Sequence, residues 1–177
     1  MPFRHIIIDD ACERPGDLLA VVDEEGVEPY ESDIFRFEAT APVVKSAEMR
    51  AIRDQFAAEL APALGQLTGR AVSHVDMRAY AYREGHYLLP HTDHQDGLER
   101  VLAYAYYLPS PNPPRGGELE LFECTLDGAE LTAMKSARLI EPVANRLVIF
   151  EVGDASLHQV REVLSGLRLS LAGWFYA

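Results

Sequence analysis

The second half of the chain is a succession of short segments in which side chains alternate with a period of two. From Ala71 to Tyr82 one set of alternating positions is mainly small or apolar and the other mainly larger and polar, as happens when successive side chains point to opposite faces of a strand. Glycine, proline, asparagine and aspartate separate this segment from those that follow. Further strands are expected at Val101–Leu108, Glu118–Glu123, Arg146–Val152, His158–Val163 and Leu167–Tyr176. So many short strands predict a mainly β fold with some helix, a β-sandwich or jelly roll.

The first 70 residues are expected to support this β-structure with helices packed on one sheet. A strand at Arg4–Ile8, a helix near Asp17–Glu24 and a loop to about Val44 are predicted first. A long helix then runs from Ser46 to about Leu67, with Ser46 as its N-cap and Gly69 as its stop signal. Apolar residues recur every three or four positions along it and predict one buried stripe, formed by Met49, Ile52, Phe56, Leu60, Leu64 and Leu67.

The length of 177 residues predicts one domain over 1–177. Residues 1–70 are its helical support region, and 71–177 are its jelly-roll core. The segment 109–117, rich in proline and glycine, is expected to be a loop between two strands.

The charge balance bears on partners and compartment. A net charge of −12 and a pI near 4.8 predict electrostatic repulsion of nucleic acids. Residues 1–10 are too short and too acidic for a signal peptide, and no run approaches the roughly 20 apolar residues of a membrane helix. Cys12 and Cys124 are too few for a disulfide framework. A cytoplasmic protein without nucleic-acid or membrane partners is therefore expected.

Histidines gather in segment 86–94, where His91 and Asp93 stand two residues apart. On a strand such residues point to the same side, so an imidazole nitrogen and a carboxylate oxygen can reach one metal ion. His158, 65 residues beyond Asp93, is the candidate third ligand. Two histidines and one carboxylate on one face leave other coordination positions open, as in non-haem Fe(II) oxygenases. The overlapping pair His94 and Asp96 is an alternative.

A charged residue on the last strand strengthens this interpretation. Within Leu167–Tyr176, Arg168 and Ser170 share a side that is expected to face the interior. A buried guanidinium is costly unless it meets an anion, and its geometry suits a bidentate carboxylate contact. The alternative is that Arg168 lies on the solvent side of the strand.

The segment from Asp76 to Tyr176 resembles the Fe(II)- and 2-oxoglutarate-dependent dioxygenases of the prolyl hydroxylase type. Several ordered motifs carry this resemblance: Tyr82-Arg83-Glu84-Gly85 before His91-Thr92-Asp93, then Tyr106-Tyr107-Leu108, residues 117–122, residues 146–150, His158, and Arg168-Leu169-Ser170 with Trp174. The sequence spacing of His91 and Asp93 from Tyr82 and Tyr107 matches the spacing in the family. It favours His91 and Asp93 over His94 and Asp96 as metal ligands.

The resemblance implies a double-stranded β-helix, which is a jelly roll, and a set of site residues. It implies that Fe(II) is held by His91, Asp93 and His158. It implies that the cosubstrate 2-oxoglutarate is bound by Arg168, Ser170, Tyr82 and Tyr107. No catalytic residue beyond the metal ligands is implied.

The activity implied by the resemblance is hydroxylation of an unactivated C–H bond by O₂, coupled to decarboxylation of 2-oxoglutarate to succinate and stimulated by ascorbate. Asp93 stands where related halogenases have a small residue, which favours hydroxylation. The implied substrate is a prolyl or other residue in a peptide or protein, and the alternative is a free amino acid or natural-product intermediate. A non-catalytic jelly-roll binding module is the alternative from another class.

Overall fold

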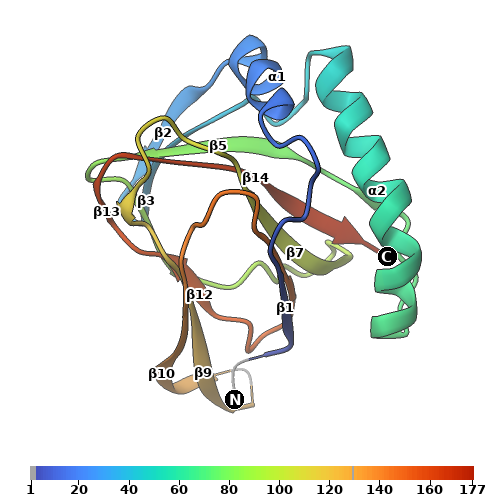
Figure 1. Cartoon of the computed structure of the whole chain (residues 1–177). Coiled ribbons are helices and arrows are strands. Elements are labelled where there is room, and N and C mark those ends of the chain that lie inside the picture. The colour runs from blue at the N-terminus through green and yellow to red at the C-terminus, as the bar shows by residue number, and fades with distance from the viewer. Residues whose placement is uncertain (1–2, 129) are drawn as a thin grey trace.

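A computed structural model of the chain describes residues 3–128 and 130–177. In these ranges, 12 strands form one sheet, ordered β1-β11-β7-β14-β5-β3-β6-β12-β9-β10, with β2 paired to β3 and β4 to β14. All the pairings are antiparallel, and β8 and β13 form a separate pair (Figure 1). The strands are β1 His5–Ile8, β2 Glu28–Ser32, β3 Phe35–Ala39, β4 His74–Val75, β5 Arg78–Arg83, β6 Tyr87–His91, β7 Arg100–Tyr107, β8 Arg115–Gly116, β9 Leu119–Asp127, β10 Glu130–Ile140, β11 Leu147–Glu151, β12 His158–Val160, β13 Val163–Ser165 and β14 Leu167–Tyr176.

The sheet curls so that its two halves enclose a common interior. Inward-facing apolar side chains of β7, β11 and β14 pack against those of β9 and β10 in one cluster. Its buried members are Ala103, Ala105, Tyr107, Leu119, Leu121, Ile140, Val148, Phe150 and Val152. This curled, two-layered arrangement confirms the jelly-roll prediction.

The helices α1 (Asp17–Glu25) and α2 (Ala47–Thr68) cover the outer face of the half that contains β7 and β14 (Figure 1). In β7 the residues that alternate with the interior ones face these helices, among them Leu102, Tyr104 and Tyr106. Because β7 is covered on both faces, its sequence is a continuous apolar run after Arg100.

Helix α2 forms as its sequence predicts. The Ser46 hydroxyl accepts a hydrogen bond from the Met49 amide (3.1 Å), and Gly69 ends the helix in the left-handed conformation. Met49 and Leu64 are fully buried. Leu67 was expected in the same stripe but is 63% exposed, because it lies in the last turn of the helix. Among the described residues, neither helix has the length and apolarity to cross a bilayer.

The expected loop before Val44 contains a β-hairpin, so that prediction was wrong. β2 and β3 pair across a two-residue turn, and the aromatic rings of Tyr30 and Phe37 stack with centroids 5.8 Å apart. Aromatic residues at alternate positions of β3, Phe35 and Phe37, hold this hairpin against β6 and β5.

Other element boundaries also differ from the sequence prediction. The segment from Ala71 to Tyr82 is broken into β4 and β5, because Asp76 leaves the ladder and binds the Trp174 amide (2.6 Å) through its carboxylate. The strand expected at 158–163 ends at Val160, and β8 lies inside the proline-rich loop. β10 was not predicted. It is an edge strand exposed along almost its whole length, so its sequence lacks the alternation of apolar and polar residues that indicates a strand.

Candidate active site

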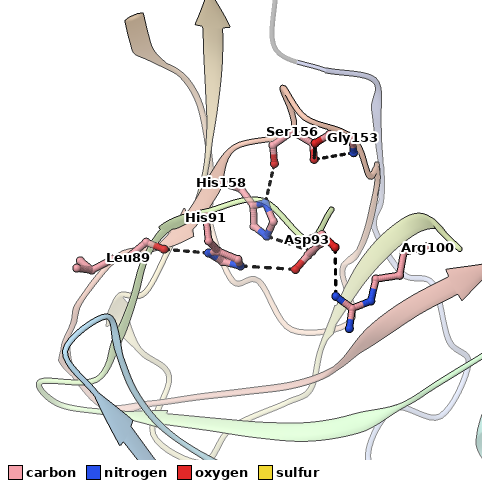
Figure 2. A network of polar contacts seen from close by, with 7 residues as sticks. All are labelled: Leu89, His91, Asp93, Arg100, Gly153, Ser156 and His158. Carbon is pink, nitrogen blue, oxygen red and sulfur yellow. Dashed lines mark hydrogen bonds and ion pairs between the residues drawn. The ribbon is translucent and has the colours of Figure 1, made fainter. Parts of the chain in front are cut away.

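Two strands and the loop after one of them bring together the three predicted metal ligands. His91 is the last residue of β6, and His158 is the first residue of β12, directly opposite it in the ladder. Asp93 lies two residues beyond the end of β6, so the expectation that it sits on the strand was wrong. Ligand atoms of all three nevertheless lie within 4.8 Å of one another (Figure 2).

Both imidazole rings are oriented by main-chain carbonyls. The Nδ1 atom of His91 lies 2.9 Å from the Leu89 carbonyl, and that of His158 lies 2.9 Å from the Ser156 carbonyl. A carbonyl only accepts, so each Nδ1 donates the hydrogen bond, and Nε2 is the atom of each ring that is directed at Asp93 and available to bind a metal. These Nε2 atoms lie 3.7 Å and 3.4 Å from the two carboxylate oxygens of Asp93.

The electrostatic environment keeps His158 in the form that binds metals. Burial lowers the pKa of His158 to about 4, and the neighbouring His91 acts in the same direction against the opposing effect of Asp93. At neutral pH its imidazole is uncharged, as a metal ligand must be.

Arg100 and Trp174 support the Asp93 segment. The Arg100 guanidinium donates to the Asp93 carbonyl (3.1 Å; Figure 2) and stacks on the Trp174 ring, with Cζ 3.6 Å from its centroid. Sequence reasoning missed Arg100. Its only signal is a charged residue at the start of an otherwise apolar strand.

A second buried cluster surrounds Arg168, which is only 3% exposed. Its Cζ lies 4.8 Å from the centroid of Tyr82 and 4.9 Å from that of Tyr107, and one guanidinium nitrogen is 3.4 Å from the Ser170 hydroxyl. Tyr82 is opposite Arg168 on β5, and Tyr107 is opposite Ser170 on β7, so strand pairing sets the cluster. Gly117 packs beside it, where a Cβ would lie 3.1 Å from Arg168 Cδ.

The Arg168 cluster has unsatisfied polar atoms that fit an anion. The Arg168 Nε and the Tyr107 hydroxyl are buried without a hydrogen-bond partner. Among residues 3–128 and 130–177, Arg168 forms no ion pair with a carboxylate. A buried guanidinium of this kind is stabilised when an anionic ligand supplies the missing charge and acceptor atoms. A carboxylate of 2-oxoglutarate meets that need, and the two imidazoles with one carboxylate are a donor set suited to Fe(II).

The alternative pair, His94 and Asp96, lies outside the metal-ligand cluster. His94 is 41% exposed at its side chain, and its Nε2 lies 3.3 Å from Asp154 and 3.7 Å from Asp96. Asp96 is fully exposed. These residues follow Asp93 in the same loop, and their donor atoms are not part of the cluster of His91, Asp93 and His158.

Comparison with known proteins identifies the family. The model of the 2OG-Fe(II) oxygenase superfamily matches residues 77–176, more than half of the chain. The chain belongs to this superfamily. Its matched region contains all three candidate metal ligands and the Arg168 cluster. A 2OG-Fe(II) oxygenase uses Fe(II) and 2-oxoglutarate, so membership agrees with the donor set and with the unpaired guanidinium.

The relatives of this 2OG-Fe(II) oxygenase superfamily member include prolyl hydroxylases. Prolyl 3-hydroxylase OGFOD1 of Xenopus laevis is 30% identical over an alignment of 185 positions, gaps included, that covers 99% of this chain and 35% of that protein. The chain thus spans about a third of that curated relative. A Pseudomonas putida prolyl-4-hydroxylase structure matches with a TM-score of 0.68 and 23% identity, covering 97% of this chain and 91% of that one. A Trichoplax adhaerens prolyl hydroxylase, solved with a hypoxia inducible factor peptide, matches with a TM-score of 0.70 and 16% identity, covering 97% and 83%.

Proposed function

We propose that this chain is an Fe(II)- and 2-oxoglutarate-dependent dioxygenase that hydroxylates a prolyl residue in a peptide or protein. The observation that carries this proposal is the buried Arg168, unpaired with any carboxylate of the described residues, in the same jelly roll as the cluster of His91, Asp93 and His158. A set of metal ligands alone fits many functions. The Arg168 cluster is in addition suited to bind an anion, which fits a reaction with a carboxylate cosubstrate.

The side chains of the cluster have distinct tasks. His91 and His158 present Nε2, and Asp93 presents a carboxylate, so together they would hold Fe(II) and leave coordination positions for other ligands. When bound, Fe(II) with 2-oxoglutarate supplies the oxidising chemistry that activates O₂ and replaces C–H by C–OH. The protein fixes the donors through the Leu89 and Ser156 carbonyls.

The Arg168 cluster would anchor the far carboxylate of 2-oxoglutarate. The guanidinium supplies charge and donors, and the Tyr107 hydroxyl supplies a further donor. Burial raises the pKa of the Tyr82 phenol, so its hydroxyl stays protonated beside the carboxylate. The rings of Tyr82 and Tyr107 flank the guanidinium and keep it in one orientation.

Prolyl hydroxylase names among the relatives, and the prolyl hydroxylases among the matched structures, support proline as the target. We also infer that ascorbate stimulates turnover by keeping the iron reduced.

The test is succinate formation from 2-oxoglutarate with Fe(II) and ascorbate, with and without proline-containing peptides. Wild type is compared with Asp93→Ala and Arg168→Ala, and with His94→Ala as a matched histidine control outside the cluster. We expect peptide-stimulated succinate formation by wild type and His94→Ala, and none by the other two variants. Hydroxylation is read as a mass gain on the peptide.

Other outcomes separate the alternatives. Succinate formation that only a free amino acid or another small molecule stimulates would replace the peptide substrate. Absence of Fe(II) binding, 2-oxoglutarate binding and turnover would favour a non-catalytic jelly-roll module.

A further inference from the structure

A cavity of about 540 Å³ lies between the helices and the outer face of the sheet. Its floor includes Tyr106 of β7 and Leu171 of β14, which point away from the interior that Tyr107 faces. The cavity is open to solvent on the side of its charged lining residues. Sites for small organic ligands are typically about 300–1,000 Å³. The cavity therefore has the size of a ligand site, on the reverse of the strands that carry the Arg168 cluster.

Helix α2 leaves apolar surface facing this cavity. Met49 and Leu64, near the two ends of the helix, are fully buried against the sheet. Ile52 and Leu60, between them on the same stripe, are only partly buried and line the cavity. Phe56 contacts the sheet through Tyr104, with ring centroids 4.8 Å apart, and forms an aromatic wall. An apolar ligand body would remove this surface from water.

The polar lining of the cavity is predominantly acidic. Three carboxylates and one guanidinium line it, and the guanidinium of Arg14 already pairs with Asp17 at 3.2 Å. This leaves Glu13 and Glu59, of which Glu59 accepts a hydrogen bond from the neutral Gln55 amide (2.8 Å). Arg53, on the same helix, is paired with Asp54 at 2.7 Å. The remaining field favours a cation.

We propose that this cavity is a second ligand site that takes a small organic cation with a flat apolar body, such as an arylalkylamine. The ring lies against Phe56 and Tyr106, and the ammonium group faces Glu13 and Glu59. Neither the metal ligands nor the Arg168 cluster takes part, so this site is independent of the proposed reaction.

The test compares tryptamine with tryptophol, which has the same indole skeleton and a neutral hydroxyl in place of the ammonium, by titration calorimetry on the full chain. Each carboxylate is expected to contribute about two- to fivefold in affinity for the cation, as a solvent-exposed ion pair does. Tryptamine therefore binds more tightly than tryptophol, and the double variant E13Q/E59Q loses this preference. Glu48→Gln, in the first turn of α2 outside the cavity lining, keeps it.

The position of the bound amine is read from the two thiols. Cys12 lines the cavity, whereas Cys124 lies on β9 outside it. Tryptamine is expected to slow alkylation of Cys12 by iodoacetamide and to leave Cys124 unchanged.

A filling variant tests the cavity itself. Ile52→Trp is expected to abolish binding, while Ala58→Trp, at an exposed position of the same helix, retains it. Circular dichroism checks that both variants fold, and E13Q/E59Q tests the site without altering its volume. Binding retained by folded Ile52→Trp, equal affinities for the two probes, or no binding of millimolar tryptamine to wild type would overturn the proposal.

Discussion

Gly117 is a position where an added methyl group would disturb both the fold and the Arg168 cluster that is proposed to bind 2-oxoglutarate. Its φ is +72°, and a Cβ there would lie 2.8 Å from Val163 Cγ2 and 3.1 Å from Arg168 Cδ. Val163 is completely buried, and a contact of 2.8 Å is closer than real Cβ atoms show, so this packed region would have to shift. Gly69, at the C-terminus of α2, has a φ of +69° in the left-handed conformation, and a Cβ there would meet no atom within 4 Å, so this glycine is the matched control.

The two substitutions separate backbone strain from crowding. An alanine in the left-handed region costs about 1–2 kcal/mol, which both Gly117→Ala and Gly69→Ala incur. Overpacking against a buried side chain costs about a further 1–3 kcal/mol, which only Gly117→Ala incurs. The free energy of unfolding should therefore fall by about 1–2 kcal/mol for the control and by about 2–5 kcal/mol at Gly117.

Urea unfolding followed by circular dichroism measures the effect on stability. The KM for 2-oxoglutarate in the succinate assay measures the effect on the cosubstrate site. Displacement of Arg168 weakens a charged hydrogen bond, so KM should rise about tenfold or more in Gly117→Ala and stay unchanged in Gly69→Ala. If Gly117→Ala matched the control in both measurements, the inferred packing of Gly117 against Arg168 would be refuted.

Three further predictions concern the site and the helix that supports the sheet. Arg168→Met should abolish 2-oxoglutarate binding yet stabilise the cosubstrate-free protein by roughly 1–4 kcal/mol, because it removes an unpaired buried charge. Thermal unfolding with and without 2-oxoglutarate measures both effects. A loss of stability without cosubstrate would contradict the reasoning. Mn(II) at about 100 times its Kd should stabilise wild type by about 2.7 kcal/mol, and EDTA should reverse this stabilisation. Asp93→Asn should not be stabilised under the same conditions. Equal stabilisation of Asp93→Asn and wild type would exclude Asp93 as a ligand. Ser46→Ala should lower the free energy of unfolding by about 1 kcal/mol through loss of the N-cap, against less than about 0.5 kcal/mol for Ser136→Ala at an exposed position of β10. Equal effects in urea unfolding would contradict the capping role.

Helix α2 and β14 are among the parts of the fold that the sequence predicts well. Helix α2 has both a capping serine and a periodic stripe, and β14 alternates leucines with residues of the opposite face, so their bounds were close to those observed. The side of Arg168 also followed from this alternation, and its burial agrees with the prediction.

The missed parts lack a comparably clear pattern. β10 is exposed on both faces, so it has no apolar side. β3 has aromatic residues at alternate positions, but only two of them in a strand of five residues, which is too few for a clear periodic signal. Asp93 reaches the histidines from a loop, where strand periodicity does not apply. The contact of Arg100 with the Asp93 carbonyl depends on tertiary structure, and no local pattern encodes it.

The carbonyls that orient His91 and His158 each belong to the residue two positions earlier in the chain. Any amino acid at those positions brings such an oxygen, so the direction of both rings is independent of side-chain identity at 89 and 156. Pro90 restricts the backbone of Leu89 to extended conformations, which further fixes one of these oxygens. The surroundings of this pair of imidazoles can therefore diverge widely in sequence while the rings keep their aim, which a search for conserved neighbouring side chains would overlook.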